Sequence, residues 1–273
     1  MDWDPTPEQL MVRDMARDFA RREILPVAAA LDREARFPSE IVRKLAEIGL
    51  MGVNVREEYG GAQAGSLAYV LAIQEIAAAC AATSVTMGVT NMVAEVIQQF
   101  GTEAQRRKYI PEITSGRFQA ASFALSEAGA GSDAGSMKTT ARRDGESWVI
   151  NGEKAWITSG PRAGVFVLWA RTGGEGTAGI SAFLVEPGVQ GFSIGRHEDK
   201  LGLRASETVS LIFEDCRLPA DALLGELNRG FRIAMMALDG GRLGIASQSL
   251  GISRAAIEEA TAYAKERKQF GRP

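Results

Sequence analysis

From residue 6 to residue 116, apolar and polar residues alternate at helical spacing. Thr6, Pro7 and Gln9 form a helix start signal, because they supply an N-cap hydroxyl, a proline at the first helical position and a capping-box partner. Further signals, with serines as N-caps and glycines as stops, are expected at Ser39, Ser66, Gly49, Gly101 and Gly116. This part is predicted to be a bundle of roughly four to six helices of ordinary length.

After residue 116 the pattern changes to short runs of β-branched and aromatic residues separated by turn residues. Asp144 and Gly145 stand between two such runs and favour a hairpin. Strands are expected at residues 138–143, 147–151, 153–158, 165–171, 181–185, 192–197 and 208–213, with a glycine-rich loop at 173–179. The middle of the chain is therefore predicted to be an antiparallel β domain of the barrel or sandwich type.

Helical periodicity returns beyond Pro219 and continues to Arg267. The three patterns together predict an α+β chain. Its expected parts are an N-terminal all-α domain at residues 1–116, a middle β domain at 117–220 and the first helices of a C-terminal α domain at 221–273.

Composition narrows the functional classes. A chain of 273 residues, 45% of them hydrophobic, can bury a sizeable core, and a net charge of −3 argues against nucleic-acid binding. The two cysteines, Cys80 and Cys216, lie in apolar surroundings and are expected to be buried free thiols of a reducing compartment. We expect a cytoplasmic protein, because no secretory signal core and no run long enough for a membrane span are present.

Two segments carry the chemistry. The first, ALSEAGAGSD at residues 124–133, gathers small residues, hydroxyls and flexible backbone where a flat cofactor could approach the main chain. The second, KAWITSG at residues 154–160, places an indole beside a hydroxyl. Together they favour a bed for an aromatic cofactor.

Both segments, in this order and spacing, resemble the acyl-CoA dehydrogenase family. The motifs DGGR at residues 239–242 and RKQFG at 267–271 extend the resemblance, which runs from about Pro7 to the last residue. The resemblance implies FAD as cofactor and an acyl-CoA as substrate. The run from residue 238 to residue 271 is most similar to short-chain or butyryl-CoA members, with short branched-chain members next.

The resemblance also implies roles for individual residues. It implies that the flavin is bound by Phe123, Leu125, Ser126, Gly131, Ser132, Trp156, Ile157 and Thr158. Substrate contacts fall to Ser132, Asp239 and Arg242, and contacts with the FAD of a neighbouring subunit fall to Arg267, Gln269 and Phe270. A homo-oligomer is therefore implied, and the family suggests a tetramer.

The implied reaction removes an α-proton and a β-hydride from the acyl thioester, and an electron-transferring flavoprotein receives the electrons. In most family members the base is a glutamate of the C-terminal domain, and in a minority it directly precedes the residue matching Arg242. That position is Gly241 here, so the base is expected beyond residue 273 and the chain is expected to be a truncated form with little or no activity. Glu127 is interpreted as a loop-structuring acid, and Ala128 replaces a common proline.

Several alternatives remain. Residues 129–134 formally fit a dinucleotide-binding fingerprint, but a long helix should follow it and a strand is expected instead. Trp156 could fill a core, Gly240 and Gly241 could mark a close helix crossing with a surface ion pair, and Arg267 could end a solvated helix. A metal site or a Ser-His-Asp triad has little support, because His197 is the sole histidine and looks like an exposed strand residue. An acyl-CoA oxidase, a flavin monooxygenase or a non-catalytic FAD or acyl-CoA binding protein stays open.

Overall fold

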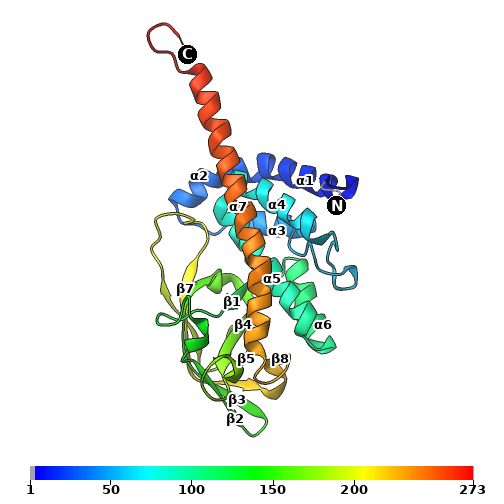
Figure 1. The fold of residues 1–273 in the computed structure, drawn as a ribbon, viewed down its shortest axis with the longest axis vertical. Helices are drawn as coiled ribbons and strands as arrows, with labels where there is room; N and C mark the ends of the chain where they lie inside the picture. The colour runs from blue at the N-terminus through cyan, green and yellow to red at the C-terminus, as the bar shows by residue number, and fades with distance from the viewer. Residues whose placement is uncertain (1–3, 273) are drawn as a thin grey trace.

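The computed structural model describes residues 4–272 and joins a helical part, a β part and one long final helix (Figure 1). The helical part contains α1 (Pro7–Phe19), the π-helical turn η1 (Ala20–Ile24), α2 (Leu25–Arg33), α3 (Ser39–Glu47), α4 (Gly65–Ala79), α5 (Ala81–Phe100) and α6 (Glu103–Thr114). The final helix is α7 (Gly230–Glu266). Short 3-10 turns are η2 (Glu57–Tyr59), η3 (Ala134–Ser136), η4 (Gly160–Arg162), η5 (Thr177–Gly179) and η6 (Ala220–Ala222). The predicted helical bundle is confirmed.

The predicted helix N-cap is confirmed at Thr6, and the predicted N-caps at Ser39 and Ser66 are wrong. Thr6 caps α1 with a complete capping box, and Pro7 is the first helical residue. Ser39 is not an N-cap, because it lies inside α3 after Pro38 and its hydroxyl donates to Gln119. Ser66 also lies one residue inside its helix, because α4 begins at Gly65. A serine just inside the first turn leaves the same sequence signal as a capping serine.

The β part is one sheet in the order β6-β7-β3-β2-β4-β5-β8, with β1 paired to β4. Its strands are β1 (Ala120–Ala124), β2 (Thr140–Asp144), β3 (Ser147–Thr158), β4 (Ala163–Arg171), β5 (Ile180–Val185), β6 (Phe192–His197), β7 (Thr208–Pro219) and β8 (Leu223–Leu224). The predicted hairpin joins β2 to β3 at Gly145, and the glycine-rich loop lies between β4 and β5. The sheet is sandwich-like and is not a closed barrel.

Two details of the predicted β domain were wrong. The sheet is not purely antiparallel, because β1 pairs with β4 in parallel, and β1 itself was not expected. β3 is one strand and is not interrupted at Gly152. A Cβ at Gly152 would lie 2.6 Å from Thr139 Oγ1, so the glycine permits close approach of neighbouring backbone and does not mark a turn.

The central strand β4 faces two cores, because successive side chains of a strand point to opposite faces. Val165, Val167 and Trp169 pack with α5, α6 and α7, and the Trp169 indole donates a 2.7 Å hydrogen bond to the Gly230 carbonyl. Phe166 and Leu168 pack with β3 and β7 on the other face. This two-sided burial fixes the sheet against the helices.

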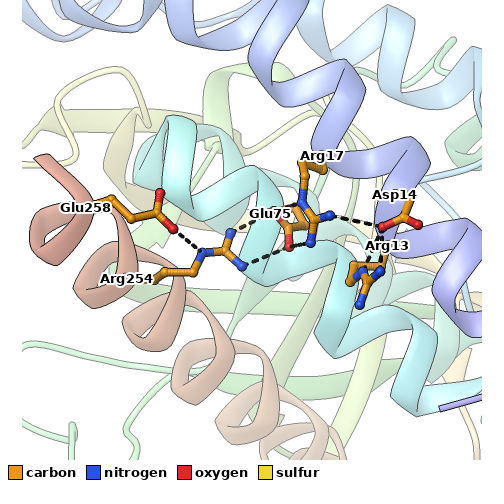
Figure 2. Close-up of polar contacts among 6 residues, drawn as sticks. All are labelled: Arg13, Asp14, Arg17, Glu75, Arg254 and Glu258. Carbon is orange, nitrogen blue, oxygen red and sulfur yellow. Dashed lines mark hydrogen bonds and ion pairs between the residues drawn. The ribbon is translucent and has the colours of Figure 1, made fainter. Parts of the chain in front are cut away.

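The helix α7 packs along α4 and α5 and then extends beyond the rest of the molecule (Figure 1). Arg254 of α7 and Arg17 of α1 both donate to Glu75 of α4, whose side chain is only 4% exposed (Figure 2). Burial by itself would raise the pKa of Glu75, but these bonds outweigh it and lower the pKa. We call these three residues the Glu75 clasp, because they tie three helices together. None of the described helices is long and apolar enough to cross a bilayer.

Candidate functional site

The segment after β1 forms one wall of a cavity. β1 runs parallel to β4 and delivers the chain into residues 125–135, which contain only one short 3-10 turn at their end. A Cβ at Gly129 or Gly131 would meet nothing within 4 Å, so the backbone there faces open space. No long helix follows, and the dinucleotide-binding alternative is therefore wrong.

Trp156 forms the opposite wall. Between Lys154 and Ile157 the register of β3 against β7 shifts by one residue, which is a β-bulge. Trp156 lies in this bulge with φ of 62°, a left-handed conformation that is costly for a bulky residue, and 61% of it is exposed. The core-filling alternative for this indole is therefore wrong.

These walls enclose a cavity of about 390 Å³, which we call the central cavity. The structure brings the predicted flavin residues to its lining: Phe123, Leu125, Ser126, Gly131, Ser132, Trp156, Ile157 and Thr158. Arg242 and apolar side chains of α5 and α7 complete the lining. Within residues 4–272, the hydroxyls of Ser126, Ser132 and Thr158 have no hydrogen-bond partner. A flat cofactor with polar edges fits such a cavity, because it stacks on the indole and satisfies the hydroxyls.

A second cavity, also of about 390 Å³, lies between α4, α5 and α7, and we call it the apolar pocket. It shares Val89, Met92, Leu238 and Arg242 with the central cavity, so the two cavities adjoin. Tyr69 reaches into the space left by two glycines, since a Cβ at Gly244 would lie 2.8 Å from its hydroxyl and one at Gly88 3.4 Å. Burial raises the pKa of Tyr69 far above its ordinary value, so this hydroxyl stays neutral.

Gly241 lines the apolar pocket next to Arg242, which lines both cavities, and we call the place where the two cavities adjoin the junction. A Cβ at Gly241 would lie 3.2 Å from the Met92 sulfur, at the lining of the apolar pocket. Gly240 faces a smaller adjoining cavity of about 70 Å³, and a Cβ there would meet nothing within 4 Å. The ion pair of the alternative interpretation exists between Asp239 and Arg242 at 2.6 Å, and both side chains are exposed. Asp239 does not line either cavity.

Carboxylates are absent from the lining of the apolar pocket within the described residues. Asp133 lines the central cavity and accepts a hydrogen bond from the Ser136 hydroxyl. Glu95 lines the smaller adjoining cavity, where Asn54 donates a 3.0 Å hydrogen bond to it and burial raises its pKa. Neither Asp133 nor Glu95 lines the apolar pocket.

One buried ion pair beside the central cavity was not predicted from the sequence. The Lys154 ammonium is 0% exposed and lies 2.8 Å from Glu127 Oε1, and it also donates a 3.0 Å bond to the Leu125 carbonyl. Burial lowers the pKa of Lys154 to about 8, although Glu127 opposes this shift. Burial would raise the pKa of Glu127, but Lys154 and backbone amides outweigh it and lower the pKa. Both groups are therefore charged at neutral pH.

Three predicted flavin contacts lie away from the central cavity. Arg267, Gln269 and Phe270 follow the end of α7, in the exposed extension at residues 256–272. They line neither the central cavity nor the apolar pocket. His197 is an exposed residue of β6, as expected, and no group of three or more possible metal ligands occurs in the described part of the chain.

Comparisons with known proteins agree with this architecture. Models of the acyl-CoA dehydrogenase N-terminal, middle and C-terminal domains match residues 6–117, 122–216 and 228–273. The short-chain specific acyl-CoA dehydrogenase of Clostridium acetobutylicum is 46% identical over 100% of this chain and 72% of its own length. The mitochondrial short-chain specific enzyme of Bos taurus is 51% identical over 96% of this chain, which spans 64% of that relative.

Solved structures show the same relationship. Butyryl-CoA dehydrogenase from Megasphaera elsdenii superposes with a TM-score of 0.96 and 38% identity, over 100% of this chain and 73% of that one. Family models cover most of the chain, and relatives near half identity match nearly all of it. The chain belongs to the acyl-CoA dehydrogenase family, a family of oxidoreductases.

Proposed function

We propose that this chain supplies the FAD and acyl-CoA binding parts of a dehydrogenase that converts a short-chain or short branched-chain acyl-CoA to the trans-2-enoyl-CoA. The observation that carries the proposal is that two adjoining cavities share part of their lining, one of them lined by Trp156 and unpaired hydroxyls and the other apolar. A redox cofactor and an acyl chain can therefore lie side by side, with the α and β carbons at the junction near Gly241.

FAD, when bound, supplies the acceptor for the β-hydride of the substrate. On the protein side, Trp156 offers one face for stacking, and the Ser126 and Thr158 hydroxyls offer polar contacts to the cofactor's edges. A cofactor and an acyl group that fill the two cavities would displace water from the reacting carbons, which would strengthen these polar contacts. We propose that Ser132 and Arg242, which line the central cavity, contact the acyl-CoA, and that Asp239 contacts it from outside that lining.

The apolar pocket limits the acyl group. Tyr69 fills the space left by Gly88 and Gly244 and thereby forms part of the pocket wall. The hydrophobic side chains of Ile73, Val85 and Ile245 favour an alkyl group there. We propose a short alkyl chain for this pocket, as the sequence resemblance implies.

Proton removal needs a carboxylate that these residues do not place at the junction. We propose that the base comes from outside residues 1–273 and that this chain alone binds its ligands with very slow turnover. The missing carboxylate also favours the second candidate function, non-catalytic binding of FAD and acyl-CoA. The electron acceptor of the working enzyme is proposed to be an electron-transferring flavoprotein.

The exposed residues Arg267, Gln269 and Phe270 support an oligomeric enzyme. A basic and aromatic extension that lies away from the central cavity of its own chain can complete the FAD site of another copy, the arginine through charge-assisted bonds to the pyrophosphate. We propose a homotetramer.

The two buried free cysteines, Cys80 and Cys216, support a reducing compartment, and we propose the cytoplasm.

An absorption spectrum tests the proposed function. The purified chain, mixed with FAD and filtered to remove free cofactor, is expected to retain about one equivalent with a protein-bound flavin spectrum. Butyryl-CoA added without oxygen should perturb this spectrum at once and bleach it very slowly, because substrate binds beside the flavin while no base removes the proton.

Other outcomes of the same experiment point elsewhere. A chain that retains no FAD contradicts the binding proposal. Fast bleaching would show that residues 1–273 contain a working base and would contradict the proposed source of the proton acceptor. If slowly reduced flavin regains its colour within seconds in air, an oxidase or monooxygenase replaces the dehydrogenase.

A further inference from the structure

We propose that Lys154 is a positioning residue that fixes the main chain of the flavin wall, acting together with Glu127. This inference rests on the proposed flavin site and adds a residue to it. Lys154 does not line the central cavity, but its side chain joins the two segments that do. Its effect on the cofactor is therefore transmitted through backbone.

The contacts of Lys154 lie at the base of the residue 125–135 segment. Its ammonium donates to the Leu125 carbonyl at 3.0 Å and to Glu127 at 2.8 Å, with the Met137 sulfur at 3.8 Å. Leu125 lines the central cavity. The buried Lys154 ammonium therefore fixes the orientation of its peptide group from the side opposite the cavity. A hydrogen bond from a charged donor in a buried setting is stronger than one between neutral groups.

Glu127 extends the same network to a third segment. Its carboxylate accepts hydrogen bonds from the backbone amides of Lys138, at 2.6 Å, and Thr139, at 2.9 Å. These two residues lie where the chain leaves the cavity wall, just before β2. Among the described residues, Glu127 is the charged side chain that contacts Lys154. The pair therefore holds both ends of the wall, and Glu127 acts as the loop-structuring acid expected from the sequence.

The main chain of β3 completes the arrangement. The Ala155 amide donates to the Ser126 carbonyl at 2.9 Å, one residue before the bulged Trp156. Lys154 and Ala155 thus bind consecutive carbonyls of the opposite wall. The spacing between Trp156 and the residue 125–126 backbone, which is the space available to a flat ring, depends on these two bonds.

Three variants separate positioning from stability. Lys154→Met keeps a side chain of similar length but removes the ammonium that donates to the Leu125 carbonyl. It also leaves the Glu127 carboxylate charged without a partner. The free energy of unfolding should therefore fall, and FAD should bind at least about tenfold more weakly. In Lys154→Met with Glu127→Gln the unpaired charge is gone and stability should largely return. FAD affinity should stay low, because the Leu125 carbonyl is still not held.

The matched control is Glu75→Gln, which breaks another buried charge network far from the lining of the central cavity. It should lower the melting temperature and leave FAD affinity within about twofold of the unsubstituted chain. Affinity is measured by fluorescence titration with FAD, well below each melting temperature. If the double variant regains affinity along with stability, or if Glu75→Gln weakens FAD equally, the positioning role is overturned.

A measurement without cofactor keeps this inference separate from the proposed function. Hydrogen exchange of the unliganded chain should be faster in Lys154→Met, and in the double variant, at the Ala155 amide and at neighbouring amides of residues 125–139. Glu75→Gln should not change exchange there. If hydrogen exchange at these amides is unchanged in both Lys154 variants, the positioning role of Lys154 is contradicted, even if FAD binds. If the unsubstituted chain binds no FAD, only the proposed function is contradicted.

Discussion

Replacing Gly241 with glutamate is expected to accelerate anaerobic flavin reduction by butyryl-CoA at least about a hundredfold, because a positioned general base contributes factors of this size. Gly241 lines the apolar pocket at its junction with the central cavity. Within the resembled family, some members carry their base directly before the residue matching Arg242. A carboxylate introduced here would be partly desolvated, and its pKa would rise toward the range useful for proton removal.

The helix tolerates this substitution. Gly241 lies within α7, and the nearest atom to a new Cβ is the flexible Met92 side chain at 3.2 Å. Gly241→Gln is the matched control, because it has the same shape and cannot accept the proton. Stopped-flow bleaching of the FAD complex measures the rate. Equal rates for the glutamate, glutamine and unsubstituted chains would contradict the assignment of the reacting carbons to this junction.

Replacing Gly251 with alanine is expected to lower the free energy of unfolding by about 3 kcal/mol, an overpacking effect at the upper end of the usual range. A Cβ at Gly251 would lie 2.3 Å from the Gln74 carbonyl oxygen and 3.0 Å from the Ala77 Cβ. The carbonyl oxygen is part of the α4 backbone, and the Cβ is bonded directly to it, so neither atom can move away by itself. The added methyl group therefore forces α4 and α7 apart. The Glu75 clasp lies beside this crossing and would be strained as well.

Gly240→Ala is the control for Gly251→Ala on the same helix. A Cβ at Gly240 meets nothing within 4 Å, so the substitution should gain about 0.5–1 kcal/mol from helix propensity alone. Urea denaturation of both variants gives the comparison. A Gly251→Ala chain as stable as the Gly240→Ala chain would contradict the close crossing of α4 and α7.

Local signals explain which parts of the fold could be predicted. Thr6 and Pro7 mark the start of α1 through neighbours in sequence, and Gly145 marks a hairpin between adjacent strands. β1 was missed because its residues are mostly small and its parallel partner β4 lies far along the chain. The sequence also could not tell which glycine of α7 makes the close crossing. Gly240 and Gly241 were suspected, whereas Gly251 packs on α4.

Two segments of the cavity wall were recognisable from their unusual composition, and the resemblance to the acyl-CoA dehydrogenase family implied which individual residues line it. The Lys154–Glu127 pair was not predictable, because a lysine within a strand is usually exposed and only the tertiary structure brings the two side chains together. The bulge at Trp156 depends on the pairing of β3 with β7, so the exposure of the indole could not be derived from its apolar neighbours. The placement of Arg267 beside a second copy stays a prediction.

The central claim is that a flavin ring lies between Trp156 and the residue 125–126 backbone. Titration with FAD, followed by tryptophan emission in the unsubstituted chain and in Trp156→Phe, tests it directly. We expect a saturable loss of the Trp156 contribution at one equivalent of FAD, because a stacked flavin quenches the indole. FAD binding that quenches both proteins equally, or no binding at all, would contradict the account.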